Sequence, residues 1–214
     1  MTQLSERIVV ATQNQGKTAE FRHAFAKLGI AVESMADYEG LPDIVEDGST
    51  FADNARIKAR IVGDALGIAV LADDSGLCVD ALGGAPGVYS ARYAGAGATD
   101  ADNNAKLLAE LARIGARVPA DELPVGVDGL SAGRFVCALA LYDPASGTFT
   151  EAEGTMDGFI VASPSGEGGF GYDPLLYIPE SGQTVAQMSK DEKQRLGHRG
   201  RALAKLLELL AARV

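Results

Sequence analysis

The amino-acid sequence predicts an α/β fold with a mixed β-sheet flanked by helices. Three patterns support this class. Apolar strand-like segments alternate with helical spacing in the first half of the chain, a hairpin pattern follows, and leucines at helical spacing close the sequence. No repeat and no Pro/Ser-rich spacer divides the 214 residues, so a single domain over residues 1–214, with room for two lobes, is expected.

Composition narrows the classes of protein further. With 47% hydrophobic residues and 22% charged residues, the chain is typical of a globular protein and not of a disordered or coiled-coil one. The net charge of −10 argues against nonspecific binding to nucleic acid or to an anionic membrane, and an anionic ligand would need local cations or a metal. Cys78 and Cys137 lie in apolar surroundings, so reduced thiols and a cytoplasmic location are expected, with a disulfide as the alternative.

In the first half, short apolar runs predict strands over residues 8–11, 30–32 and 68–72, the last ending at Asp73-Asp74. Helical spacing predicts a helix over 17–28 closed by Gly29, and a second helix capped by Ser49 or Thr50. In the second half, Thr99 and Asp102 indicate a capping box at the start of a third helix. The elements expected after it are an exposed loop over 117–133, a hairpin of 135–142 with 148–153, a strand over 158–162, and a final leucine-rich helix.

The turn between the first strand and the first helix is the first candidate site. Its sequence is Thr12-Gln13-Asn14-Gln15-Gly16-Lys17, in which small polar groups and backbone N–H groups at a helix start suit phosphate oxygens and Lys17 adds a cation. Together with Ala11 and Thr18 it nearly matches the P-loop pattern GxxxxGK[ST], but Ala11 replaces the first glycine. An ordinary turn with a solvated lysine is an equally weighted alternative.

Acidic residues give two further candidates. Asp73-Asp74-Ser75 follows an apolar strand, where a carboxylate can bind a divalent cation or polarise water, although Asp-Ser-Gly is also a common turn. Which aspartate contacts the metal more directly is open at this point. Glu46-Asp47-Gly48 precedes the helix with Asn54 and Lys58, which share a helix face, so a metal–phosphate site is one interpretation and a helix cap with a solvated lysine is the other.

Two later segments are weaker candidates. The glycine-rich stretch over residues 168–174 contains Phe170, Tyr172 and Asp173, which suit stacking and hydrogen bonding to a flat heterocycle or, alternatively, a packed turn. Lys193, His198 and Arg199 gather hydrogen-bond donors before the last helix, where charged residues are most often solvated.

Taken in order, these segments resemble the inosine triphosphate pyrophosphatase family, which hydrolyses non-standard purine nucleoside triphosphates. The matching stretches are residues 12–17, 46–58, 73–77, 83–93, 168–174 and 198–200. The resemblance implies an elongated mixed β-sheet with helices, two lobes with a central active-site cleft, and a homodimer. It implies the reaction NTP + water → NMP + pyrophosphate with Mg²⁺ as cofactor, with ITP, dITP and XTP as substrates removed from the nucleotide pool.

The resemblance also implies roles for the matching residues. Glu46 and Asp74 would bind Mg²⁺, with Asp74 as the proton acceptor for the attacking water. Ser75 would contact the substrate. The triphosphate would be bound by Thr12, Gln13, Asn14, Gln15, Gly16, Lys17 and Lys58, and the nucleobase side of the pocket would be formed by Phe170, Gly171, Tyr172, Asp173, Lys193, His198 and Arg199. Two features depart from the family: the 117–133 stretch is longer than the family usually needs, and Gly197 stands where a serine is common.

Two other functions are consistent with parts of the sequence. A P-loop ATPase or kinase would use residues 11–18 as a degraded P-loop and the strand-end aspartates for Mg²⁺, but it gives no role to the 83–93 and 168–174 stretches. A non-enzymatic nucleotide-binding protein would bind ITP with Mg²⁺ without turnover. Hypoxanthine and xanthine carry a carbonyl at purine position 6 where adenine carries an amino group, so donors from His198 or Arg199 would favour the first two.

Overall fold

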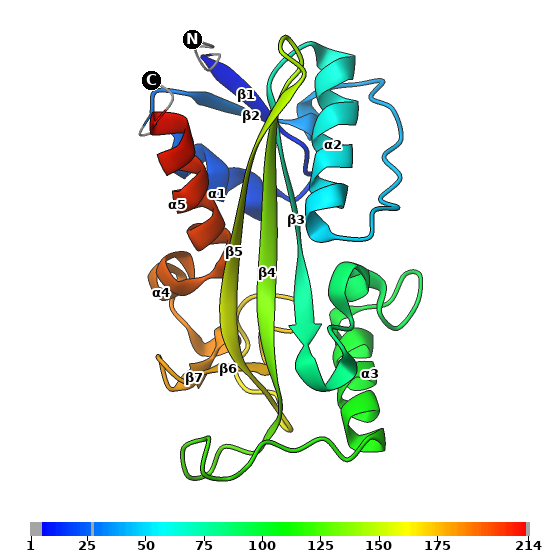
Figure 1. Cartoon of the computed structure of the whole chain (residues 1–214), viewed down its shortest axis with the longest axis vertical. Helices are drawn as coiled ribbons and strands as arrows, with labels where there is room; N and C mark the ends of the chain where they lie inside the picture. The colour runs from blue at the N-terminus through cyan, green and yellow to red at the C-terminus, as the bar shows by residue number, and fades with distance from the viewer. Residues whose placement is uncertain (1–5, 27, 213–214) are drawn as a thin grey trace. The chain divides into compact units, whose positions relative to one another are not determined.

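The computed structural model of the chain describes residues 6–26 and 28–212, and at residue 15 the backbone alone. Within these residues, the strands form one seven-stranded sheet in the order β2-β1-β3-β4-β5-β6-β7 (Figure 1). The strands are β1 (Arg7–Val10), β2 (Ala31–Ser34), β3 (Val70–Val79), β4 (Gly129–Asp143), β5 (Thr148–Val161), β6 (Leu176–Ile178) and β7 (Gln183–Thr184). The α-helices are α1 (Gln15–Ala26), α2 (Phe51–Leu66), α3 (Asp100–Arg113), α4 (Lys190–Leu196) and α5 (His198–Ala211).

The sheet is mixed, which confirms the predicted class. Strand β1 pairs in parallel with both β2 and β3, whereas β5 pairs with β6, and β6 with β7, in antiparallel fashion. Parallel strands need a crossover connection, and α1 and α2 supply the connections from β1 to β2 and from β2 to β3. No helix among the described residues is both long enough and apolar enough to span a bilayer.

The chain divides into two compact units, which we call the first and the second unit. The first comprises Met1–Asp74, Cys137–Gly154 and Arg201–Val214, and the second comprises Ser75–Val136 and Thr155–Gly200. The boundaries fall inside β3, β4, β5 and α5.

The core of the first unit has two layers, one on each face of its strands. Ile8, Val10 and Leu71 pack with residues of α1 and α5. Val9 and Val70 alternate with them and pack against α2, together with Ala72. The other main members are Phe21, Phe25, Leu203 and Leu206 in the first layer and Ala55, Ala59 and Val62 in the second. This period-two alternation fixes which face each later residue of β3 occupies.

The second unit has its own core around α3. Leu107 and Leu111 of this helix are fully buried and pack with residues from β3, β4, β5 and β6, among them Leu77, Phe135, Met156, Ile160 and Leu176. The predicted capping box at the start of α3 is confirmed: the Thr99 hydroxyl accepts a hydrogen bond from the Asp102 amide, and Asp102 accepts one from the Thr99 amide.

The predicted start of α2 is also confirmed, with Thr50 as the N-cap in a capping box with Asp53. The helix ends at Gly67, whose φ of 66° is the left-handed conformation of a glycine C-cap. Neither of the described cysteines, Cys78 and Cys137, is in a disulfide.

Several predicted boundaries were wrong. Strand β3 does not end at Ala72 but continues through Asp73-Asp74 to Val79. Strand β4 begins at Gly129, so the 117–133 stretch is a loop only in its first part, and the predicted strand over 158–162 is the end of β5. In each case polar or glycine residues interrupt the apolar pattern, but the backbone hydrogen bonds of a ladder do not depend on side-chain polarity. The first helix spans Gln15–Ala26 instead of 17–28.

Candidate active site

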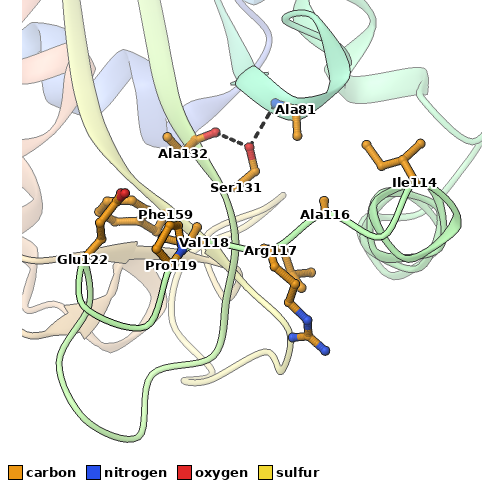
Figure 2. A pocket seen from close by; sticks show the side chains of 11 residues that line it. Ala81, Ile114, Ala116, Arg117, Val118, Pro119, Glu122, Ser131, Ala132 and Phe159 are labelled. Carbon is orange, nitrogen blue, oxygen red and sulfur yellow. Dashed lines mark hydrogen bonds between the residues drawn. The ribbon is translucent and has the colours of Figure 1, made fainter.

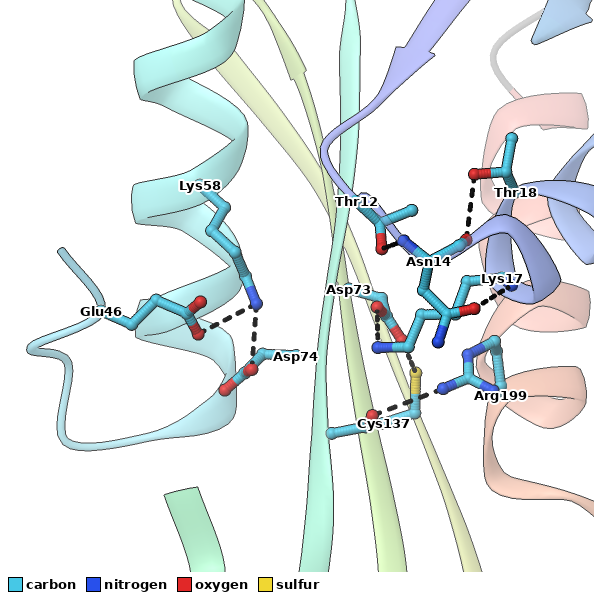
Figure 3. Close-up of polar contacts among 11 residues, drawn as sticks. Thr12, Asn14, Lys17, Thr18, Glu46, Lys58, Asp73, Asp74, Cys137 and Arg199 are labelled. Carbon is cyan, nitrogen blue, oxygen red and sulfur yellow. Dashed lines mark hydrogen bonds and ion pairs between the residues drawn. The ribbon is translucent and has the colours of Figure 1, made fainter. Parts of the chain in front are cut away.

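Asp73 and Asp74 lie on opposite faces of β3. Successive side chains of a strand point to opposite sides, so Asp74 shares the α2 face with Val70 and Ala72, and Asp73 shares the α1 face with Leu71. Figure 3 shows the two carboxylates on either side of the strand, each beside a lysine. The doublet therefore supplies one carboxylate to each of two separate clusters.

On the α2 face, one ammonium group bridges two carboxylates. The Lys58 Nζ atom lies 3.1 Å from Glu46 Oε2 and 3.0 Å from Asp74 Oδ1 (Figure 3). The side chains of Lys58 and Asp74 are only 11% and 14% exposed. We call Glu46, Lys58 and Asp74 the bridging cluster. It lies wholly in the first unit and brings together three residues that the sequence singled out.

Asn54 ties the bridging cluster to the loop that carries Glu46. Its amide nitrogen donates to Asp74 Oδ2 at 3.2 Å, and its amide oxygen accepts from the Gly48 backbone N–H at 2.8 Å. A Cβ atom on Gly48 would lie 2.7 Å from that amide oxygen and 2.6 Å from the Cβ of Asp53. Only glycine allows this approach, which explains the Glu46-Asp47-Gly48 motif as the device that brings Glu46 beside α2.

The charges of the bridging cluster shift the pKa values of both Lys58 and Asp74. Burial alone lowers the pKa of Lys58, but the carboxylates of Asp74 and Glu46 outweigh it and raise the pKa above its ordinary value. Burial raises the pKa of Asp74, with a contribution from the Glu46 charge, against the opposing effects of Lys58 and Asn54. With both carboxylates ionised, the cluster carries one net negative charge. A carboxylate of raised pKa is a better proton acceptor than an ordinary one.

On the α1 face, Lys17 is paired with Asp73. The Nζ atom of Lys17 lies 2.6 Å from Asp73 Oδ1, and the Cys137 thiol lies 3.9 Å from Asp73 Oδ2. The Asp73 side chain is 1% exposed and that of Lys17 is 20% exposed. The lysine predicted to bind phosphate thus has an internal carboxylate partner, which sequence reasoning missed because 56 residues separate the two.

The turn before α1 is held by its own side chains. The Lys17 backbone N–H donates to Asn14 Oδ1 at 3.1 Å, the hydrogen bond of a helix N-cap, and the Asn14 N–H donates to Thr12 Oγ1 at 3.1 Å. Buried Thr18 donates its hydroxyl to the Asn14 carbonyl. The first turn of α1 therefore begins directly after a polar loop that is held by internal hydrogen bonds. The predicted contact of the Gln15 side chain lies outside the described residues.

In the second unit, Asp173 organises the glycine-rich loop. Its Oδ2 atom accepts hydrogen bonds from the Phe170 backbone N–H at 3.1 Å and from Lys193 Nζ. The Lys193 ammonium also lies 5.0 Å from the centre of the Phe170 ring, and this ring is 55% exposed. The structure thus brings three of the predicted base-side residues together, with an exposed aromatic face beside a cation.

Helix α3 anchors the same loop through two residues that sequence reasoning missed. The Gly171 N–H donates to Asp100 Oδ2 at 2.6 Å, and Asn104 Nδ2 donates to the Gly171 carbonyl at 3.0 Å. These partners are 71 and 67 residues away along the chain, so no local pattern indicates them.

Tyr172 is part of the core of the second unit. Its buried hydroxyl donates to the Ser90 carbonyl at 2.8 Å, and burial raises the pKa of Tyr172 above its ordinary range. Ser90 in turn accepts a hydrogen bond from the Leu77 N–H at 2.9 Å through its hydroxyl. The 83–93 stretch therefore has a structural role, because it ties β3 to the glycine-rich loop.

Ser75, His198 and Arg199 are also in the second unit. Arg199 is buried, and its Nη2 atom donates to Ser75 Oγ at 3.4 Å. The His198 ring stacks on Phe135 with 5.0 Å between ring centres and an interplanar angle of 25°. The structure thus pairs Arg199 with Ser75 and holds His198 against the core.

The glycine-rich loop gives a stability prediction. Gly169 has a φ of +82°, and a Cβ atom there would lie 2.0 Å from Asp173 Oδ2 and 2.9 Å from Lys193 Nζ. Gly171 has a φ of +61°, but a Cβ atom there would have no neighbour within 4 Å. We expect Gly171→Ala to destabilise the protein by about 1 kcal/mol through backbone strain alone, and Gly169→Ala to cost clearly more. Urea unfolding of both variants measures this, and equal losses would contradict the described loop.

A surface pocket elsewhere in the second unit is not lined by any predicted site residue (Figure 2). Its volume is about 310 Å³, and its lining is mainly apolar, from the end of α3 and the segment after it to β4 and Phe159 of β5. The Ser131 hydroxyl on its wall accepts a hydrogen bond from the Ala81 N–H and donates to the Ala132 carbonyl. The Ser131 hydroxyl is thus engaged within the protein.

The protein is an open-sheet α/β protein with lysine–carboxylate clusters on both faces of β3. One of these clusters lies next to a helix start. This arrangement is common among proteins that bind phosphorylated ligands. Comparison of its amino-acid sequence shows the particular family. The chain belongs to the Ham1 family, whose sequence model matches residues 8–209.

Relatives and a solved structure agree with this assignment. The dITP/XTP pyrophosphatase of Geobacillus kaustophilus is 49% identical over 203 residues, which cover 95% of this chain and 93% of the relative. The dITP/XTP pyrophosphatase of Streptococcus pyogenes is 44% identical over 97% of this chain, which spans only 60% of that relative's length. The structure of a HAM1 protein from Coxiella burnetii has 38% identity and a TM-score of 0.85, covering 98% of this chain and 100% of that one. The resemblance to the inosine triphosphate pyrophosphatase family is confirmed.

Proposed function

We propose that this chain hydrolyses the non-standard purine nucleoside triphosphates ITP, dITP and XTP to the monophosphate and pyrophosphate. Its family and the names of its relatives support this substrate class. The observation that carries the mechanism is the bridging cluster, in which carboxylates from two separate segments face the same positive charge. The water oxygen bonds to phosphorus, the α–β P–O bond breaks, pyrophosphate leaves, and the water proton passes to a carboxylate.

The bridging cluster fits a divalent metal ion. Oxygens of Glu46 and Asp74 already share one cationic partner at 3.1 and 3.0 Å, and Mg²⁺ is usually held by one or two carboxylates together with waters and substrate phosphates. Glu46 and Asp74 are therefore the proposed ligands. Bound Mg²⁺ would supply charge neutralisation for the phosphates and a lowered pKa for a coordinated water.

Asp74 is the proposed proton acceptor. Burial raises the pKa of its carboxyl, which makes it a stronger base once it is ionised. The Asn54 amide fixes the orientation of the carboxylate by donating to Oδ2, while Oδ1 faces Lys58.

The triphosphate is proposed to bind at the start of α1 and at Lys58. Backbone N–H groups in the first turn of a helix attract anionic oxygens, and residues 12–17 form that turn together with the loop fixed by Asn14. Lys17 and Lys58 offer hydrogen-bond donors to the phosphate oxygens and stabilise the charge that develops on leaving pyrophosphate. Because both lysines face carboxylates, the net positive charge that a polyanion needs would come from the metal ion.

The base side is proposed to be formed by residues of the second unit: Phe170, Gly171, Tyr172, Asp173, Lys193, His198 and Arg199. Ser75, in the same unit, is proposed to contact the substrate. The exposed Phe170 ring offers a stacking face, and Lys193 offers a donor beside it. A carbonyl at purine position 6 accepts such a donor and the adenine amino group does not. A homodimer and a cytoplasmic location complete the proposal.

Substrate and product analysis tests the proposed function. We expect Mg²⁺-dependent release of pyrophosphate from ITP, dITP and XTP, with kcat/KM for ATP at least about 100-fold lower because a mismatched amino group leaves a donor unpaired. ATP and GTP serve as controls in the same assay. Orthophosphate as the product would favour a P-loop-type ATPase, and binding of ITP without turnover would favour a nucleotide-binding protein.

A further inference from the structure

We infer that Lys58 is the resident counter-ion of the bridging cluster, and that its ammonium group competes with a divalent cation for the oxygens of Glu46 and Asp74. The inference rests on the proposed function, because that proposal assigns the same two carboxylates to a metal. The new element is that the Lys58 ammonium group occupies the position of the metal ion when no metal is bound.

The contacts of the ammonium group support this role. Lys58 Nζ approaches one oxygen of each carboxylate, at 3.1 and 3.0 Å. Asn54 donates to the second oxygen of Asp74 at 3.2 Å, so each oxygen of this carboxylate already has a donor from α2, and the charged donor is the Lys58 ammonium. Lys58 projects from the middle of α2, a helix of 16 residues capped at both ends, which limits where its ammonium group can lie.

The charge balance supports it as well. Two carboxylates face one ammonium group, so the bridging cluster retains one negative charge in its resident state. Removing the lysine charge leaves two negative carboxylates close together in a partly buried site. Their mutual repulsion favours the binding of any cation that can enter. A divalent ion brings twice the charge of the ammonium group that it displaces.

The ion pair of Lys17 with Asp73, on the other face of β3, provides the control for the loss of a lysine. Lys17 and Asp73 form an ion pair at 2.6 Å on the opposite face, with the carboxylate 1% exposed. Loss of Lys17 removes a lysine of the same type from the same unit without touching Glu46 or Asp74. Its loss has no reason to create a site for a divalent cation.

The test is a titration of Mg²⁺ alone, without nucleotide, into the full chain by calorimetry. The proteins are the parent, Lys58→Met and the matched Lys17→Met. We expect Lys58→Met to bind Mg²⁺ at least about tenfold more tightly than the parent, because a competing charge only a few ångströms from each carboxylate is gone. Its melting temperature should fall in EDTA and recover in Mg²⁺. Lys17→Met should also lose stability, but without recovery in Mg²⁺.

If Lys58→Met does not fold in EDTA, Lys58→Gln, which keeps a hydrogen-bond donor and removes the charge, takes its place. Equal or weaker Mg²⁺ binding by the Lys58 variant overturns the inference. If that result accompanies parental ITP turnover that chelation abolishes, the proposed function stands and only the role of Lys58 fails. If no protein binds Mg²⁺ and parental ITP turnover persists in EDTA, the inference and the metal assignment fail together.

Discussion

Replacement of Asp74 by asparagine is expected to lower kcat for ITP about 10³-fold or more while the fold remains intact. The amide has nearly the same shape, and its oxygen can still accept a hydrogen bond from Lys58, whereas its NH₂ group would face the Asn54 donor, so that contact is lost. The group that receives the water proton and one charged metal ligand are both lost. Steady-state kinetics with pyrophosphate detection, together with circular dichroism, measures the two effects separately.

Asp64→Asn is the matched control for this substitution. Asp64 also lies in the first unit, but its carboxylate accepts a hydrogen bond from the Tyr142 hydroxyl at 2.8 Å and has no part in the bridging cluster. We expect its kcat to stay within about twofold of the parent, since surface substitutions away from a site have small effects. A near-parental rate for Asp74→Asn at saturating Mg²⁺ would contradict the role of Asp74.

Lys17→Ala is expected to have two effects that can be separated. Removal of the ammonium group leaves the buried Asp73 carboxylate without that compensating charge, which we expect to cost about 3 kcal/mol of folding stability. The same substitution should raise KM for ITP at least about tenfold, because a cation at the triphosphate is lost. The preference for ITP over ATP should change much less. Urea unfolding and steady-state kinetics give the two values.

The double variant Lys17→Ala/Asp73→Asn separates structure from binding. Neutralising Asp73 should recover most of the lost stability, because the buried charge that Lys17 balanced is gone. The raised KM should remain. Recovery of both the stability and the parental KM in the double variant would show that Lys17 serves only to balance Asp73.

Local signals in the sequence were sufficient for much of the fold. Thr50 and Thr99 mark helix starts because the capping box is a local device, and the alternation of apolar runs indicated the mixed α/β sheet. The length of β3 was missed, since Asp73-Asp74 interrupts the apolar pattern before it resumes at Leu77. Had the strand been read through the doublet, period-two alternation would have placed the two carboxylates on opposite faces.

The candidate site was predictable in part for the same reason. Asn54 and Lys58 share a helix face by their spacing, and both contact Asp74 in the structure. The approach of Glu46 depends on a loop whose path the spacing does not specify. The pairing of Lys17 with Asp73 and the anchoring of Gly171 by Asp100 join residues that only the tertiary fold brings together.

Anomalous diffraction from crystals grown with Mn²⁺ and a non-hydrolysable ITP analogue would show directly whether Glu46 and Asp74 hold the metal ion together. We expect a manganese peak within coordinating distance of carboxylate oxygens from both Glu46 and Asp74, with phosphate oxygens completing its ligands. A manganese ion bound to the phosphates with neither carboxylate among its ligands would contradict this assignment.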